Sequence, residues 1–133
     1  MKTLTSVRVL VVDDDEDSRE MIRAALELQG ASATCVADAH QALAEFKKRR
    51  PDVVVSDIGM PGADGHAFLR EVRALPRRRG GHVPAVALTA YAKGDDATRV
   101  LTAGYQVHVP KPVEPAELAN VVATLTGRVP TLS

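Results

Sequence analysis

The chain has 133 residues, 45% of them hydrophobic and 26% charged, which is the composition of one ordinary globular domain and excludes a disordered chain. Its 17 basic and 17 acidic residues give a formal net charge of zero, which provides no argument for attraction to nucleic acid or to a membrane surface. No run reaches the roughly 20 apolar residues that span a bilayer, and the N-terminus lacks a signal-peptide pattern, so we expect a cytoplasmic protein.

The first half of the chain alternates between apolar runs of strand length and segments with helical periodicity. Residues 7–12 form the first expected strand, and the helix after it is expected to end at Gly30. Residues 32–37 form a short second strand, after which Asp38 and Gln41 resemble a capping box. The positions expected to face inward are Met21, Ile22, Ala25, Leu26 and Leu28 in the first helix, and Ala39, Ala42, Leu43 and Phe46 in the second.

The same alternation continues to the end of the chain. Further strands are expected at residues 53–55, 85–88 and 107–109. A proline in the first turn leaves no hydrogen bond unmade, so Glu114 and Pro115 are expected to open the last helix. The helical positions are Phe68, Leu69, Val72 and Leu75 in the third helix, Ala97, Val100 and Leu101 in a fourth that ends at Gly104, and Leu118, Val121, Val122 and Leu125 in the last.

Five strand–helix units in one short chain predict an α/β fold. Continuous apolar strands are typical of parallel sheets that are covered by helices on both faces. Crossovers between parallel strands are right-handed, and the chain is too short for a typical eight-unit barrel, so we expect a doubly wound sheet. Residues 6–127 are expected to form this domain, with loose tails at residues 1–5 and 128–133.

Polar residues stand where four of the expected strands end. The pair Asp13 and Asp14 closes the first strand, and Asp57, Thr89 and Lys111 follow later strands. In open parallel sheets the crevice beyond the carboxyl ends of the strands is where ligands bind, so these side chains are expected to form one site. A carboxylate can accept a phosphoryl group as a nucleophile, Mg²⁺ prefers oxygen ligands, and an ammonium neutralises the oxygens that are transferred.

These motifs identify a resemblance to the receiver domain of two-component response regulators. It extends over essentially the whole chain and implies a flavodoxin-like fold with five parallel strands in the order 2-1-3-4-5. The amino-acid sequence around Asp57 is most similar to that of receivers of hybrid sensor histidine kinases. The motifs that carry the resemblance are Val11-Val12-Asp13-Asp14-Asp15, Ser56-Asp57-Ile58-Gly59-Met60-Pro61-Gly62, Leu88-Thr89-Ala90 and Lys111-Pro112.

The resemblance implies a role for each site residue. Asp57 would be the phosphoacceptor, and Asp13, Asp14, Asp57 and the backbone carbonyl of Gly59 would hold Mg²⁺, for which Mn²⁺ can substitute. The other implied roles are phosphoryl binding and switching for Thr89, Ala90 and Lys111, tuning of the phosphoryl lifetime for Gly59 and Tyr91, and a cis peptide bond between Lys111 and Pro112.

One position departs from the pattern of the family. The family has an aromatic ring three residues before the lysine, where this chain has His108, and Tyr105 is out of register. An imidazole gains less from apolar burial than the ring of tyrosine or phenylalanine, so a weaker switch between Thr89 and this position is expected. Histidine is in general the side chain that can change its charge near physiological pH, so a pH-dependent output is a hypothesis for this position.

The function expected from the resemblance is that of a phosphoacceptor which controls a partner. The donor would be a histidine kinase or a histidine phosphotransfer protein that docks near the first helix, and the downstream partner is unknown. The chain would catalyse only its own phosphorylation and dephosphorylation, either as a free-standing regulator or as the receiver of a hybrid kinase. Two alternatives remain, an interaction module that is not phosphorylated and an aspartyl-nucleophile phosphatase. No direct contact with nucleic acid or membrane is expected, and the run of arginines at residues 77–79 indicates a solvated loop.

Overall fold

The computed structural model describes residues 3–58, 65–89 and 104–128. It contains a five-stranded parallel sheet in the order β2-β1-β3-β4-β5, which confirms the doubly wound α/β fold predicted from the sequence. The strands are β1 (Arg8–Val12), β2 (Ser32–Val36), β3 (Val53–Asp57), β4 (Ala85–Thr89) and β5 (Val107–Pro110). The helices are α1 (Glu16–Leu28), α2 (Ala39–Lys48), α3 (Gly65–Arg73), the short 3₁₀ helix η1 (Arg77–Arg79) and α5 (Pro115–Leu125). The residues that mark the expected fourth helix, Ala97, Val100 and Leu101, lie outside the described residues.

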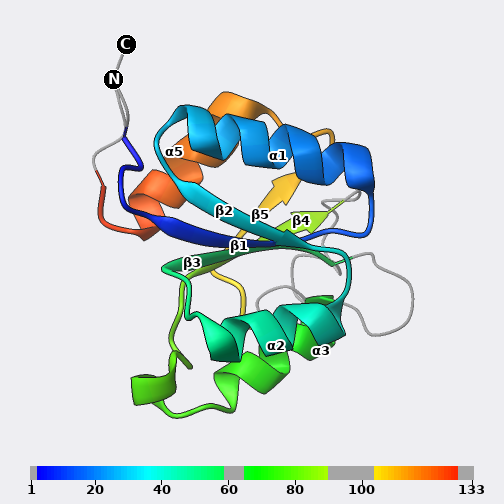
Figure 1. Ribbon diagram of the computed structural model, residues 1–133, viewed down its shortest axis with the longest axis vertical. Helices are drawn as coiled ribbons and strands as arrows, with labels where there is room; N and C mark the ends of the chain where they lie inside the picture. The colour runs from blue at the N-terminus through cyan, green and yellow to red at the C-terminus, as the bar shows by residue number, and fades with distance from the viewer. Residues whose placement is uncertain (1–2, 59–64, 90–103, 129–133) are drawn as a thin grey trace.

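Helices cover both faces of the sheet (Figure 1). α1 and α5 lie against one face, and α2 and α3 lie against the other. Side chains alternate along each strand, so β1 sends Val9 and Val11 into the core under α1 and α5, and Leu10 and Val12 into the core under α2 and α3. The continuous apolar runs of the sequence are therefore explained by two cores that share one sheet.

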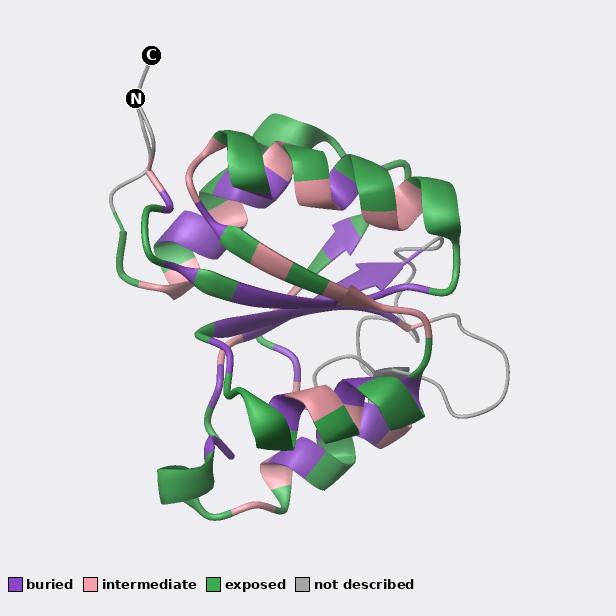
Figure 2. Ribbon diagram, viewed as in Figure 1, coloured by how far each residue is buried: buried purple, intermediate pink, exposed green. Residues whose placement is uncertain are grey.

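Burial falls from the centre of the sheet to its edges (Figure 2). β3 and β4 are buried at every position, and β1 is buried at all positions after Arg8. The edge strand β2 is half-buried or exposed along its length, and β5 alternates between buried and exposed positions. The expectation of burial on both faces therefore holds for the three central strands.

The helix ends follow the local signals in the sequence. Asp38 caps α2 by accepting a hydrogen bond of 2.7 Å from the backbone N–H of Gln41. The Gln41 side chain reaches back as in a capping box, but it accepts from the N–H of Ala37 at 3.1 Å, one residue before the cap. Gly30 follows α1 with φ of 97°, a left-handed conformation that favours glycine.

The prediction for the inner face of α1 is wrong at two apolar positions. Met21 is 40% exposed and Leu28 is 74% exposed, while Ile22 and Leu26 are fully buried. Successive residues are turned by about 100° around a helix, so an inner face defined by Ile22, Ala25 and Leu26 leaves both side chains outside it. α1 therefore presents two large apolar side chains to solvent.

The inner face of α5 is also shifted from the expectation. Leu118 and Val122 are fully buried as expected, but Val121 and Leu125 are only partly buried. Val121 and Leu125 instead line the side of the helix that borders β5.

The packed core begins before the expected domain start at residue 6. Leu4 is fully buried in the core under α1 and α5, and its backbone N–H donates to the carbonyl of Gln29 at 2.8 Å. The expected N-terminal tail is therefore anchored from this residue onward.

The parallel register brings the strand ends of the sheet together. Val12 of β1 pairs with Ser56 of β3, and Asp57 pairs with Leu88 of β4. Thr89 in turn pairs with Pro110 of β5. Consequently the polar residues at or just after these ends share one edge of the sheet.

Candidate functional site

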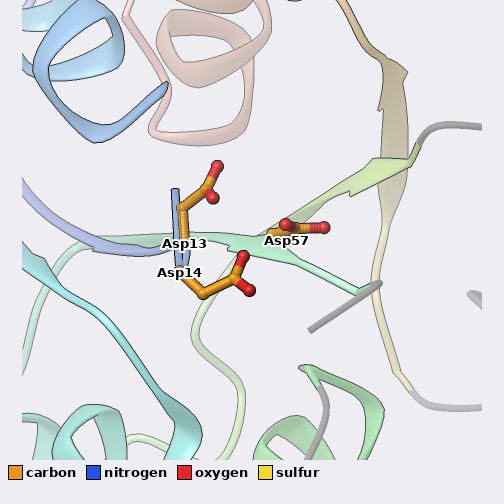
Figure 3. Close-up of side chains that lie close together, drawn as sticks. All are labelled: Asp13, Asp14 and Asp57. Carbon is orange, nitrogen blue, oxygen red and sulfur yellow. The ribbon is translucent and has the colours of Figure 1, made fainter. Parts of the chain in front are cut away.

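Three carboxylates meet at the carboxyl edge of the sheet. Asp13 and Asp14 follow β1 directly, and Asp57 is the last residue of β3 (Figure 3). Each offers an oxygen, and these oxygens lie within 4.8 Å of one another. Asp13 is fully buried and Asp57 is 8% exposed, while Asp14 faces solvent. Two carboxylates of the cluster are therefore shielded from solvent, and solvent reaches the cluster at Asp14.

Lys111 joins the two buried carboxylates. Its Nζ donates to Oδ2 of Asp13 and to Oδ2 of Asp57, both at 3.1 Å. Burial lowers the pKa of Lys111, but the hydrogen bonds and charges of Asp13 and Asp57 outweigh this effect, so the pKa is raised overall. The ammonium therefore stays charged between two anions at physiological pH. The peptide bond from Lys111 to Pro112 is cis.

Asp13 is held in place by groups at the start of α1. Its Oδ1 accepts from the N–H of Asp15 at 2.9 Å, and its Oδ2 accepts from Oγ of Ser18 at 2.8 Å. Arg19 donates through Nη1 to the backbone carbonyl of Asp13 at 2.8 Å. Sequence reasoning missed Ser18 and Arg19, although their place in the first turn after an acidic pair was a signal that they face the site.

Asp15 has the capping role that one of the sequence interpretations assigned to it. Its Oδ2 accepts from the backbone N–H of Ser18 at 3.2 Å, and α1 begins at the next residue. The three consecutive acids therefore divide their work, because the first two belong to the carboxylate cluster and the third starts the helix.

Thr89 and His108 occupy different environments. Thr89 closes β4 and is 3% exposed, and its carbonyl accepts from the N–H of Lys111 at 2.8 Å. His108 pairs with Ala87 in the sheet and is exposed. Tyr105 is 2% exposed and packs in the core under α2 and α3, so it is a core residue in this structure.

Gly59, Ala90 and Tyr91, which the resemblance also assigned to the site, lie outside the described residues.

The donor set fits a hard divalent cation. All three side chains of the cluster offer carboxylate oxygens, which Mg²⁺, Mn²⁺ and Ca²⁺ prefer over nitrogen or sulfur ligands. Three carboxylates whose oxygens lie within 4.8 Å repel one another, and Lys111 supplies only one positive charge. A divalent cation held by these carboxylates would balance the remaining charge.

The sequence matches a known family along most of its length. The response regulator receiver domain pattern matches residues 9–123. The chain is 42% identical over 122 residues to an uncharacterized 14.6 kDa protein of Leptolyngbya boryana, with 92% of each chain covered. It is 32% identical over 128 residues to hybrid signal transduction histidine kinase D of Dictyostelium discoideum, covering 92% of this chain but only 8% of that protein.

A solved structure shows the same fold with a metal ion. The receiver domain of a sensor histidine kinase from Pseudomonas aeruginosa superposes with a TM-score of 0.84 and 33% identity, covering 92% of this chain and 99% of that one. Its crystal structure has a magnesium ion coordinated in the active-site cleft.

In the described part of the present chain, no helix is both long and apolar enough to cross a membrane.

Proposed function

Because the chain belongs to the response regulator receiver domain family, we propose that it is a phosphoacceptor switch in which Asp57 receives the phosphoryl group. The observation that carries the proposal is the contact of one half-buried lysine with two carboxylates of a three-acid cluster. Membership of this family also removes the aspartyl-nucleophile phosphatase from consideration. The chain is proposed to act in the cytoplasm and to catalyse only its own phosphorylation and dephosphorylation.

The chemistry proposed for Asp57 is nucleophilic attack on phosphorus. A carboxylate oxygen of Asp57 forms a bond to phosphorus while the bond to the donor nitrogen breaks, which leaves an acyl phosphate on the chain and returns the electron pair to the donor. Lys111 already lies 3.1 Å from Asp57 Oδ2, so its ammonium is placed to neutralise charge on the transferred oxygens. Ser18 and Arg19 act indirectly, since they orient Asp13.

Asp13, Asp14 and Asp57 are the side chains proposed to hold a divalent cation, with Mg²⁺ as the first choice and Mn²⁺ as a substitute. When bound, such an ion supplies positive charge that allows an anionic phosphoryl group to approach three carboxylates. The backbone carbonyl of Gly59 is proposed as a further ligand by resemblance to the family.

The proposed output is a rearrangement around Thr89. An acyl phosphate brings strong acceptor oxygens and nearly two negative charges by analogy with other phosphoresidues, and the Thr89 hydroxyl and the Ala90 backbone are proposed to bind them. His108 holds the position of the usual switch aromatic but is exposed, so a smaller conformational response is expected here. Tyr91 and Gly59 are proposed to set the phosphoryl lifetime.

The donor is proposed to be a histidine kinase or a histidine phosphotransfer protein. A hollow of about 290 Å³ opens beside the site, and both α1 and the segment after β5 contribute to it. Met21 and Val113 give it an apolar part, and Asp15 and Asp17 give it an acidic rim. A partner helix that carries apolar and basic side chains next to a phosphohistidine would fit this surface.

Intact mass spectrometry tests the phosphoacceptor proposal. The wild-type chain, incubated with Mg²⁺ and acetyl phosphate or phosphoramidate, should gain one labile phosphoryl group. The adduct should be absent in Asp57→Asn and in EDTA, because the first removes the nucleophile and the second the cation. Asp38→Asn is a matched control, since Asp38 caps α2 outside the cluster, and it should be phosphorylated normally. Repeated failure of the wild-type chain to form the adduct would instead favour the interaction module that is not phosphorylated.

A further inference from the structure

A basic pocket lies at the amino edge of the sheet, opposite the carboxylate site. It is a hollow of about 510 Å³ between the end of α2 and η1, and these two segments lie close together at one end of the molecule (Figure 1). Arg50 is near the start of β3, and η1 precedes β4, so both segments approach the end where the parallel strands begin. The basic side chains that line it are Lys47, Lys48, Arg50, Arg78 and Arg79.

Within the part of the chain that the structure describes, no acidic side chain pairs with the cations of this pocket. No Asp or Glu lines the hollow, and none of its five basic residues takes part in an ion pair found among the described residues. Lys47 and Lys48 lie in the last turn of α2, where positive charge interacts favourably with the helix dipole. The dipole therefore explains the presence of these two lysines without a ligand. That reason does not extend to Arg78 and Arg79, which belong to η1 and yet line the same hollow.

The pocket is partly preorganised. The Arg50 guanidinium donates through Nη1 to the backbone carbonyl of Arg78, which fixes the two segments to each other. Gly80 has φ of 95°, and a Cβ there would lie 2.5 Å from Cδ of Arg50 and 2.9 Å from Cζ of Phe46. The turn therefore needs glycine to let Arg50 pack closely, and a fixed guanidinium loses less freedom when it binds a ligand.

We propose that this pocket binds a small polyphosphate with an apolar body, such as a nucleoside triphosphate. Guanidinium groups bind phosphate oxygens through two parallel hydrogen bonds, and five clustered cations match several phosphate charges better than one. Phe46 and Leu75 line the hollow between the cations and offer an apolar surface for a base or a sugar. The volume lies in the range of about 300–1,000 Å³ that is usual for small-molecule sites, and the cations surround a hollow rather than forming a stripe along a duplex.

Calorimetric titration of the full, unphosphorylated chain in EDTA tests this site apart from the carboxylate cluster, which cannot hold a metal under these conditions. ATP and inorganic tripolyphosphate are the probes, and the expected result is saturable binding with a Kd below about 1 mM. Tighter binding of ATP supports the proposal in full. Equal binding supports the phosphate site but overturns the role given to the apolar surface. No saturable binding of either probe, or tighter binding of a short DNA duplex, would overturn the proposal.

A pair of variants with equal charge change makes the test specific. Arg78→Glu with Arg79→Glu should weaken ATP binding by about tenfold or more, because both side chains line the hollow. Arg49→Glu with Arg77→Glu changes the net charge equally on the same two segments but outside the hollow, and should weaken it by less than about threefold. All four arginines are exposed, so both variants are expected to fold, which circular dichroism checks. An equal loss in both variants would show nonspecific attraction and contradict the proposal.

Discussion

Lys111 is the side chain that holds the buried acids of the site together. It contacts Asp13 and Asp57 at 3.1 Å each, and its own side chain is 24% exposed. Removing one member of a buried ion pair is costly because the remaining charge is left without a partner. Here the carboxylates of Asp13 and Asp57 would both lose their contact with the ammonium, and solvent has little access to either of them.

We expect Lys111→Met to lower the free energy of unfolding of the metal-free protein by about 1–3 kcal/mol, a range reduced for partial exposure. Urea unfolding at neutral pH in EDTA measures the loss. The same substitution in the Asp57→Asn background should cost less, because only the Asp13 carboxylate then loses its contact with the ammonium. An equal loss in both backgrounds would show that the contact with Asp57 contributes nothing.

The pH dependence of this pair follows from the raised pKa of Lys111. Its stabilising contribution should be complete below the ordinary value of 10.5 and should be lost as the pH rises through the higher pKa of the folded state. The difference in unfolding free energy between the wild type and Lys111→Met should therefore be constant between neutral pH and about pH 10. It should shrink only at higher pH. A difference that has already disappeared before the pH reaches 10.5 would contradict the raised pKa of Lys111.

The end of α3 is tied to the loops before β4 and β5 by a single arginine. Arg73 donates through Nε and Nη2 to the carbonyl of Gly104 at 3.1 and 2.8 Å, and through Nη1 to the carbonyl of Gly81 at 2.9 Å. A Cβ at Gly104 would lie 2.9 Å from Cγ of Arg73, so the backbone and the side chain are in close contact. Burial lowers the pKa of Arg73, which reflects its partial removal from water.

Arg73→Met should therefore destabilise the fold by about 1–3 kcal/mol, since hydrogen bonds from a charged donor to two carbonyls are lost. Arg70→Met is the matched control on the same helix, because Arg70 is exposed, and it should change stability by less than about 0.5 kcal/mol. Urea unfolding measures both variants. Equal effects would mean that helix composition rather than the link between loops is responsible.

At the scale of the whole molecule, charge is separated between the two ends of the sheet. The carboxyl edge carries Asp13, Asp14 and Asp57, and the amino edge carries the basic pocket. The formal net charge is nevertheless zero, so composition alone does not reveal this division. Each end is suited to ligands of opposite charge, a divalent cation at one and a polyanion at the other.

Mg²⁺ should stabilise the entire fold by mass action. A cation that binds only the folded chain, at about 100 times its Kd, adds about 2.7 kcal/mol, which corresponds to a rise in Tm of about 10 °C for a domain of this size. Thermal unfolding with and without MgCl₂, at equal ionic strength, measures this increment. It should be strongly reduced in Asp13→Asn and retained in Asp17→Asn, since Asp17 lies in the first turn of α1 outside the cluster. Equal increments in both variants would locate the cation elsewhere.

The sequence by itself determined the elements whose signals are local. The cap at Asp38 and the glycine at position 30 depend on neighbours within a few residues, and the structure confirms both of them. The strand ends could also be placed from sequence, because apolar runs stop where polar residues begin, and parallel topology then brings those ends to one edge. The strand order itself came from the resemblance to the family.

Tertiary structure decided the features that depend on segments far apart in the chain. Met21 and Leu28 are apolar in the sequence, yet the way α1 packs leaves them exposed. The arginines at residues 77–79 looked like a solvated loop, and only the fold places two of them beside the basic end of α2. Periodicity reports which face of an element is apolar, but the neighbour that meets that face is chosen by packing across the whole domain.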